Sequence, residues 1–252
     1  MATFLNYEKP LLCAMILCNT PKECIEKIKA SLADGAEAFG IQLCKLKKEY
    51  RTKEILCEIF AACEGLPIYI TSYPIDESEG DSDEECARFL LLGLEAGATL
   101  CDVTGDIFEH GAPYQLATDP EAVKKQKALI DEIHRRGGEV LMSCHTNQST
   151  TVEENLMIAR AQAERGADVL KIVNIASSLE EVPTYIEAIQ KILAETDKKL
   201  LFLVGKDGRI LRYIGPEFGV CMYLCVYEHG PLDADDQPTI KQAKAVRDNI
   251  RH

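Results

Sequence analysis

Short apolar runs alternate with amphipathic helical patterns from one end of the chain to the other. Each run is short and rich in Leu, Ile, Val and Ala, and none shows strict polar–apolar alternation. Such continuous runs are typical of strands that are buried on both faces of a parallel sheet. The pattern predicts eight strands, over residues 11–17, 38–43, 66–71, 98–103, 139–143, 169–173, 200–204 and 220–226.

A helical pattern follows each of these runs, and several helices begin at recognisable capping sequences. Thr20, Ser82, Thr151 and Ser178 each precede a glutamate by three residues, which is the capping-box pattern, and Asp119-Pro120 is a second type of helix start. The predicted helices cover about 21–33, 53–63, 83–97, 120–136, 152–165, 179–195, 209–214 and 239–250.

Eight strand–helix units in 252 residues, with no Pro/Ser-rich linker between them, favour one (β/α)8 TIM barrel domain over residues 1–252. An open, doubly wound sheet is the alternative. It is disfavoured because no Gly-x-Gly-x-x-Gly sequence follows the first strand.

Composition and charge restrict the classes of partner. The net charge is −13 and no basic stripe is present, which argues against nucleic acid and anionic membrane surfaces. Eleven cysteines, an odd number scattered through apolar runs, indicate small buried side chains in a reducing compartment. There is no signal-peptide pattern and no apolar run long enough to cross a bilayer, so we expect a cytoplasmic protein.

Lys171 is the most unusual residue of the predicted core, because it lies in the apolar run 169–173. A buried amine destabilises the fold unless it is paired, or unless burial lowers its pKa and makes it a nucleophile. The structural alternative is a lysine whose head group reaches water at the end of the strand.

In a (β/α)8 barrel, the functional groups lie at the C-terminal ends of the strands. His145 follows the strand before that of Lys171, so the two side chains can meet inside one opening. An amine beside an imidazole suits Schiff-base chemistry, in which the amine condenses with a ketone and the imidazole removes a proton from the adjacent carbon. Other polar residues at strand ends include Gln42, Tyr73, Asp102, Arg212 and Gln237.

The segment Gly205-Lys206-Asp207-Gly208 has two interpretations. Barrels often bind phosphate after the seventh strand, and with Arg212 this segment would suit a sugar phosphate. A tight turn explains the same glycines and is the favoured interpretation.

Three motifs together resemble the type I 3-dehydroquinate dehydratases, which are Schiff-base lyases on a (β/α)8 barrel. Ser143-Cys144-His145 resembles the family's Ser-Tyr-His, and the run from Gly166 to Ile172 resembles its Gly-Ala-Asp-Ile-Val-Lys-Ile. The segment from Gly205 to Arg212, with Gly215, Glu217, Phe218 and Gly219 after it, is similar to the family's sequence at strand seven. The resemblance runs in register from about Pro10 to the last helix.

The resemblance implies an activity and a set of roles. Lys171 would form the imine, His145 would be the general acid/base, and Glu77 would orient His145. Arg212 would bind the substrate carboxylate, beside Gln237 from the loop after strand eight. The family reaction removes a proton from C2 and hydroxide from C1 of 3-dehydroquinate, giving 3-dehydroshikimate and water in the shikimate pathway of aromatic amino acid biosynthesis. No cofactor and no metal are implied, because the lysine supplies the electron sink.

Several positions depart from the family pattern. Where the family has Glu-x-Arg-x-Asp after strand two, this chain has Gly40, Gln42 and Cys44. Tyr73 replaces an arginine, Thr104 a glutamate and Asp233 a serine. Sites that hydrogen-bond hydroxyl groups discriminate strongly against analogues, so these changes predict an altered preference for the ring substituents. We therefore include Gln42, Tyr73 and Asp233 among the substrate-binding residues.

The leading hypothesis is a lyase acting on 3-dehydroquinate or a related carboxylated cyclic ketone. An aldolase using the same imine, and a barrel that binds a metabolite without catalysis, are the alternatives. We also expect a homodimer, because barrels of this kind often pair.

Overall fold

All eight predicted strands are present and form one parallel sheet. The computed structural model describes residues 2–74, 79–233 and 235–250. The strand order is β7-β6-β5-β4-β3-β2-β1-β8. The strands are β1 (Leu11–Ile16), β2 (Ala38–Gln42), β3 (Ile68–Thr71), β4 (Leu100–Thr104), β5 (Glu139–His145), β6 (Val169–Ala176), β7 (Lys199–Lys206) and β8 (Met222–Cys225).

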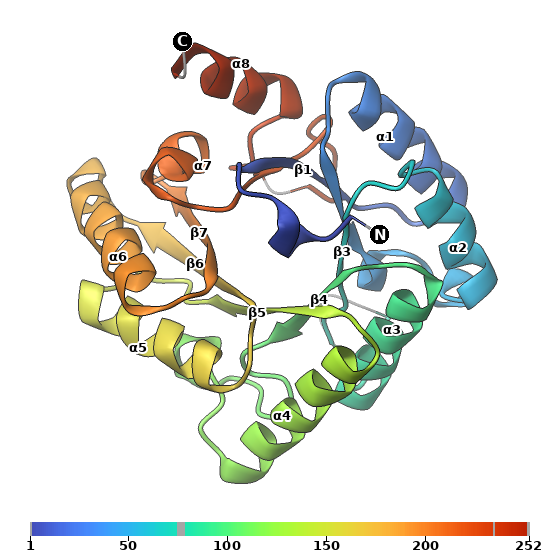
Figure 1. The fold of residues 1–252 in the computed structure, drawn as a ribbon, viewed down its shortest axis with the longest axis horizontal. Coiled ribbons are helices and arrows are strands. Elements are labelled where there is room, and N and C mark those ends of the chain that lie inside the picture. The colour runs from blue at the N-terminus through green and yellow to red at the C-terminus, as the bar shows by residue number, and fades with distance from the viewer. Residues whose placement is uncertain (1, 75–78, 234, 251–252) are drawn as a thin grey trace.

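The sheet curls into a barrel that β7 and β8 nearly close. A single parallel bridge joins Leu200 in β7 to Val220 just before β8, and the amide of Cys221 donates to the Leu200 carbonyl at 2.8 Å. Figure 1 shows the helices as a ring outside the strands. The predicted TIM barrel is therefore confirmed, and the open doubly wound sheet is wrong.

The helices follow the strands as the sequence predicts. Among the described residues, none of them has the length and apolar content needed to cross a bilayer. They are α1 (Pro21–Ala33), α2 (Lys53–Ala61), α3 (Asp83–Ala96), α4 (Pro120–Arg135), α5 (Val152–Glu164), α6 (Val182–Glu195), α7 (Leu211–Ile214) and α8 (Ile240–Ile250).

Local capping explains most of the helix starts. Thr20, Ser82 and Thr151 each form a complete capping box, and Asp119 accepts a hydrogen bond from the amide of Ala122. The capping role predicted for Ser178 is wrong. A short 3-10 turn over 179–181 comes first, and α6 then begins at Val182, where the proline in its first turn suits the helix start.

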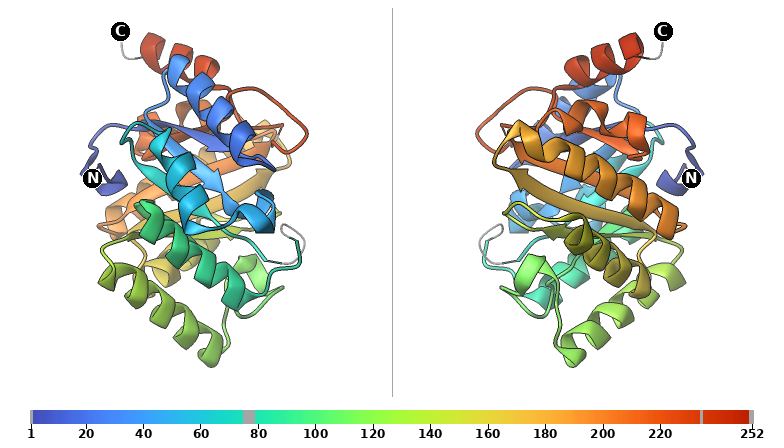
Figure 2. Two further views of the ribbon diagram at one scale, coloured as in Figure 1. Left: turned by 90° about the vertical axis from the view of Figure 1, so that its right-hand side faces the viewer. Right: turned by 90° about the vertical axis from the view of Figure 1, so that its left-hand side faces the viewer.

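The N-terminal segment covers one end of the barrel. Figure 2 shows it at the opposite end from the connection between β8 and α8. The amides of Phe4 and Leu5 donate to the carboxylate of Glu139, the first residue of β5, at 3.0 and 3.2 Å. The Phe4 ring packs edge-on against Tyr69, with 6.5 Å between centroids. The N-terminal end of the strands is thereby covered, and the other end remains the open one.

The strand register determines which side chains share the barrel interior. Lys171 in β6 pairs with Ser143 in β5, so both side chains project from the same side of the sheet. His145 lies two residues beyond Ser143 and therefore projects to that side one layer nearer the C-terminal end. The sequence spacing thus puts the amine and the imidazole in successive layers of one opening.

Candidate active site

A cavity of about 460 Å³ opens at the C-terminal end of the barrel. Its volume lies within the range usual for small-molecule sites. Its walls are mainly alternate residues of the strands together with residues of the loops that follow. The lining residues are Met15, Leu17, Gln42, Lys45, Tyr73, His145, Lys171, Val173, Leu203, Arg212, Leu224, Leu232, Asp233 and Gln237.

Lys171 lies at the base of this cavity with its amine paired. Its residue is only 4% exposed, so the side chain does not reach bulk water. Nζ lies 3.3 Å from Asp102 Oδ2, and it donates to the hydroxyls of Tyr69 and Tyr73 at 3.1 and 3.2 Å. The amine is therefore paired inside the barrel, and its head group does not reach water at the end of the strand.

Both tyrosines also bind the same carboxylate. The hydroxyls of Tyr69 and Tyr73 donate to Asp102 Oδ2 at 2.6 and 3.0 Å. Burial raises the pKa of each phenol well above its usual value, and the negative charge of Asp102 adds to this effect. Both phenols therefore stay protonated at neutral pH. The two phenols and the Lys171 amine all donate to the same oxygen, Asp102 Oδ2.

Gly40 makes room for this cluster. A Cβ at that position would lie 2.2 Å from Met15 Sδ and 2.8 Å from Tyr69 Cδ1. The family pattern has a glutamate at this position. In this chain the Tyr69 ring and the Met15 side chain occupy the space next to Gly40 instead.

His145 lines the same cavity and contacts this cluster through Tyr73. Its ring packs edge-on against Tyr73, with 6.0 Å between centroids. Nδ1 is 2.7 Å from Gln115 Oε1, and the same oxygen accepts the backbone N–H of His145 at 2.8 Å. Lys171 and His145 thus line one cavity, with Tyr73 in contact with both.

The environment of His145 keeps its imidazole neutral. Burial and the positive charge of Lys171 lower its pKa to about 3, Asp102 opposes this effect, and Arg212 adds a smaller lowering. An ordinary imidazole titrates near pH 6.5. The His145 ring therefore keeps one unprotonated nitrogen, and can act as a base, at any pH above about 3.

We therefore expect His145 to titrate near pH 3 in the folded protein and near pH 6.5 in urea. Its ring proton shifts in a pH titration by NMR would measure both values. Because only the unfolded state takes up this proton between those limits, the free energy of unfolding should fall as the pH falls through that window. A His145→Asn variant should lack this part of the pH dependence. A folded-state titration near pH 6.5 would contradict the prediction.

Arg212 extends from α7 into the wall of the cavity. Its Nε donates to the Val204 carbonyl at 3.1 Å, and Nη2 lies 2.8 Å from Asp236 Oδ2. A guanidinium has five N–H donors, so these two contacts leave others for an anion. Arg212 is only 6% exposed, so water screens its positive charge weakly.

Three other predicted site residues line the cavity without contacting the amine. Gln42 donates from Nε2 to Cys44 Sγ at 3.4 Å, and Gln237 lies in the loop after β8. Asp233 accepts the amide of Gly230 at 3.0 Å and lies 3.5 Å from Lys27 Nζ. Its carboxylate is therefore held partly by its own loop.

Two other candidates remain. Glu77, predicted to orient His145, lies outside the described residues. Lys206 is exposed, has a positive φ of 52° and is not among the residues lining the cavity with Arg212. A Cβ at Gly208 would lie 2.3 Å from Val204 Cγ1, so this glycine is explained by close packing. The turn interpretation of 205–208 fits these observations, and the phosphate interpretation does not.

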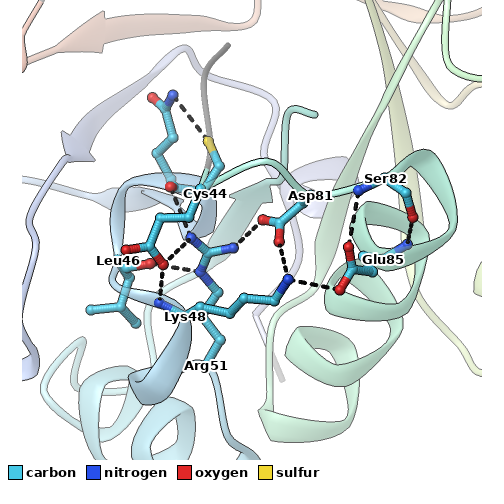
Figure 3. A network of polar contacts seen from close by, with 9 residues as sticks. Cys44, Leu46, Lys48, Arg51, Asp81, Ser82 and Glu85 are labelled. Atoms are coloured by element: carbon cyan, nitrogen blue, oxygen red, sulfur yellow. Dashed lines mark hydrogen bonds and ion pairs between the residues drawn. The ribbon is translucent and has the colours of Figure 1, made fainter. Parts of the chain in front are cut away.

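A buried ion pair fixes the loops beside the cavity. Arg51 donates to the carbonyls of Cys44 and Leu46 at 3.0 and 2.6 Å and to the carboxylate of Asp81 (Figure 3). Lys48 also binds Asp81, at 2.9 Å. Burial opposes ionisation of Asp81, but the hydrogen bonds from Lys48 and Arg51 outweigh it and lower its pKa. The loop after β2 is thereby tied to the residues that precede α3.

Sequence reasoning missed two residues of the site. Tyr69 lies inside an apolar strand, and its one signal is that it stands four residues before Tyr73. Gln115 lies in a long loop whose path no local pattern specifies. Its one signal was the length of that loop, since long loops in compact domains are often functional.

The chain is similar to known proteins along nearly its whole length. Residues 12–251 match the family model for type I 3-dehydroquinase. The chain belongs to the type I 3-dehydroquinase family. The 3-dehydroquinate dehydratase of Klebsiella pneumoniae subsp. pneumoniae is 25% identical over 245 residues, which cover 94% of this chain and 92% of that protein.

Solved 3-dehydroquinate dehydratase structures have the same fold. The 3-dehydroquinate dehydratase of Geobacillus kaustophilus gives a TM-score of 0.81 at 15% identity, covering 100% of this chain and 96% of that one. The type I enzyme of Clostridium difficile, solved with covalently modified comenic acid, gives 0.81 at 17% identity and covers 97% and 93%. At these identities the likeness is one of fold.

Proposed function

We propose that this protein dehydrates 3-dehydroquinate, or a related carboxylated cyclic ketone, through an imine on Lys171. The observation that carries the proposal is the buried amine of Lys171 facing a neutral imidazole in a cavity of suitable size. Membership of the type I 3-dehydroquinase family supplies the reaction class, a carbon–oxygen lyase.

In the first step, the Lys171 ammonium gives one proton to the neutral imidazole of His145, and the free amine attacks the ketone carbon, whose oxygen takes a second proton from the attacking nitrogen. The carbinolamine that forms then expels its hydroxyl as water, which takes back the proton held by His145, and becomes an iminium ion. Asp102 accepts hydrogen bonds from the amine and both tyrosines, so its negative charge stabilises the cation that replaces the ammonium. Tyr73, 3.2 Å from Nζ and in ring contact with His145, is placed to relay these protons without a net change in its own protonation.

In the second step, His145 removes a proton from the carbon next to the iminium carbon, and the electron pair enters an enamine. The enamine then expels hydroxide from the following carbon, and the imidazolium of His145 supplies the proton that makes it water. Hydrolysis of the conjugated iminium returns the Lys171 amine and releases the enone. The low pKa of His145, about 3, makes it a weak base but a strong acid for the elimination.

The substrate carboxylate is the partner we assign to Arg212. Gln42, Tyr73, Asp233 and Gln237 are the remaining substrate-binding residues of the proposal, and Glu77 remains a proposed member of the catalytic group. Because Tyr73 replaces an arginine and donates to Asp102, the chain has fewer charged groups for ring hydroxyls than the family pattern. We therefore expect a preference among carboxylated cyclic ketones that differs from that of the family.

An assay with 3-dehydroquinate tests the proposal directly, because the conjugated product absorbs in the ultraviolet. A panel of carboxylated cyclic ketones should be run in parallel, each with borohydride followed by intact-mass analysis. We expect turnover of at least one compound, together with a reduced adduct on the protein. A mass unchanged by every compound, with no turnover, would refute the imine mechanism.

The proposal also includes a homodimer in the cytoplasm. All eleven cysteines are free in the structure, as a reducing compartment requires. Twofold dimers are the commonest soluble assemblies. Sedimentation equilibrium should give twice the chain mass of 28.0 kDa, and a value equal to that mass would exclude the dimer.

A further inference from the structure

The contact between Gln115 and His145 determines which imidazole nitrogen carries the proton. Gln115 Oε1 lies 2.8 Å from the backbone nitrogen of His145, which can only donate. The amide atom at this position must therefore be the oxygen, which can only accept. The same oxygen is 2.7 Å from Nδ1 of the ring. Nδ1 must then bear the hydrogen, and Nε2 of the neutral ring is unprotonated.

The loop that carries Gln115 is held firmly against β5. Gly105 follows β4, and its amide donates to the Ser143 carbonyl at 2.7 Å. A Cβ at Gly105 would lie 2.4 Å from the Gln115 carbonyl oxygen and 2.5 Å from Cys144 Sγ. The loop thus approaches β5 more closely than any residue other than glycine allows at this point.

Two buried side chains brace the same loop from outside. Gln126 of α4 donates from Nε2 to the carbonyls of Gly105 and Ile107, both at 2.9 Å. Arg165, after α5, donates to the carbonyl of Ala117 and to Gln126 Oε1. Gln126 is fully buried and Arg165 is 9% exposed. The loop is therefore a rigid support, as a residue that orients a base requires.

We propose that Gln115 is a positioning residue that holds His145 in its Nδ1–H tautomer and keeps Nε2 free as the base. This inference rests on the function proposed above for His145. It assigns the orienting contact on Nδ1 to a neutral amide from the loop after β4. An amide fixes the tautomer without adding the negative charge that would make the imidazole more basic.

The charged groups around the His145 ring stay the same when Gln115 is replaced, so the variants isolate the contact on Nδ1. His145 faces Lys171 of β6, Asp102 of β4, Arg212 of α7 and the neutral hydroxyl of Tyr73. None of these groups changes when Gln115 is replaced. Gln115→Glu keeps an acceptor oxygen on Nδ1 and adds a negative charge, whereas Gln115→Met removes the acceptor and keeps the length of the side chain.

The test is ¹⁵N NMR of the ring nitrogens of His145, combined with kinetics on 3-dehydroquinate. In the wild type, Nδ1 should be protonated and Nε2 bare. Gln115→Met should give a mixture of tautomers and lower kcat on the order of 10²-fold, with little change in KM. Gln115→Glu should keep the wild-type tautomer, raise the pKa of His145 and move the acid limb of kcat/KM to higher pH.

Gln148→Met is the matched control, because that glutamine is exposed in the next loop and its side chain has no role in the proposal. It should leave both the tautomer and kcat unchanged. A wild-type Nε2–H tautomer, or a Gln115→Met variant with wild-type spectrum and kcat, would overturn the inference. The NMR readout needs no turnover, so an inactive protein with the expected tautomer would count against the proposed function alone.

Discussion

Replacing Lys171 by methionine should lower the dehydration rate on the order of 10⁴-fold or more and abolish the borohydride adduct. The proposed imine forms on Nζ, and methionine has no amine. Losses of that size follow the removal of a covalent nucleophile. The rate is measured by the ultraviolet absorbance of the product, and the adduct by intact and peptide mass.

The interpretation of this variant needs two controls. Lys171→Met leaves Asp102 buried without its cation, which lowers stability, so the double variant with Asp102→Asn separates misfolding from lost chemistry. That double variant should be folded by circular dichroism and inactive. Lys206→Met, at an exposed lysine outside the cavity, should keep both activity and adduct. An adduct on another lysine in wild type would show that Lys171 is not the nucleophile.

Replacing Arg51 by methionine should have the largest effect on stability, about 3 kcal/mol or more of unfolding free energy. Arg51 and Asp81 have side chains with 0% exposure, and the guanidinium also satisfies the carbonyls of Cys44 and Leu46 (Figure 3). Removing one partner leaves a buried charge and two carbonyls without their donor. Urea unfolding followed by circular dichroism measures the change.

Lys191→Met is the matched control for a lost ion pair. Lys191 lies 2.8 Å from Glu187 on the exposed face of α6, with side chains 45% and 55% exposed. Such exposed pairs contribute little, so this variant should unfold within about 0.5 kcal/mol of wild type. The double variant Arg51→Met with Asp81→Leu should recover part of the loss, since no buried carboxylate then remains. An Arg51→Met variant as stable as Lys191→Met would contradict the prediction.

The strand–helix order could be predicted because it depends on local signals. Continuous apolar runs mark strands buried on both faces, and Thr20, Ser82 and Thr151 mark helix starts through contacts within one turn. Ser178 shows the limit of this reasoning. Its capping-box spacing is present, but the proline that follows suits a helix beginning at Val182.

The presence of Lys171 and His145 in one cavity was also predictable, because parallel strands bring the ends of neighbouring strands to one edge. What the amine binds was not predictable from the residues around it. Asp102 and Tyr69 reach Lys171 from 69 and 102 residues away in the chain. No periodicity or spacing encodes such a contact, since it depends on which side chains the closed barrel turns inward at one level.

The sequence by itself determined the barrel, the open end of its strands and the two residues whose chemistry defines the proposed reaction. Only the tertiary structure decided that Gln115 contacts His145, because the path of the loop after β4 follows from the packing of Gly105, Gln126 and Arg165. Local sequence specifies strands and helices through short-range geometry. Loop paths and buried polar contacts depend instead on distant groups, which meet only when the barrel closes.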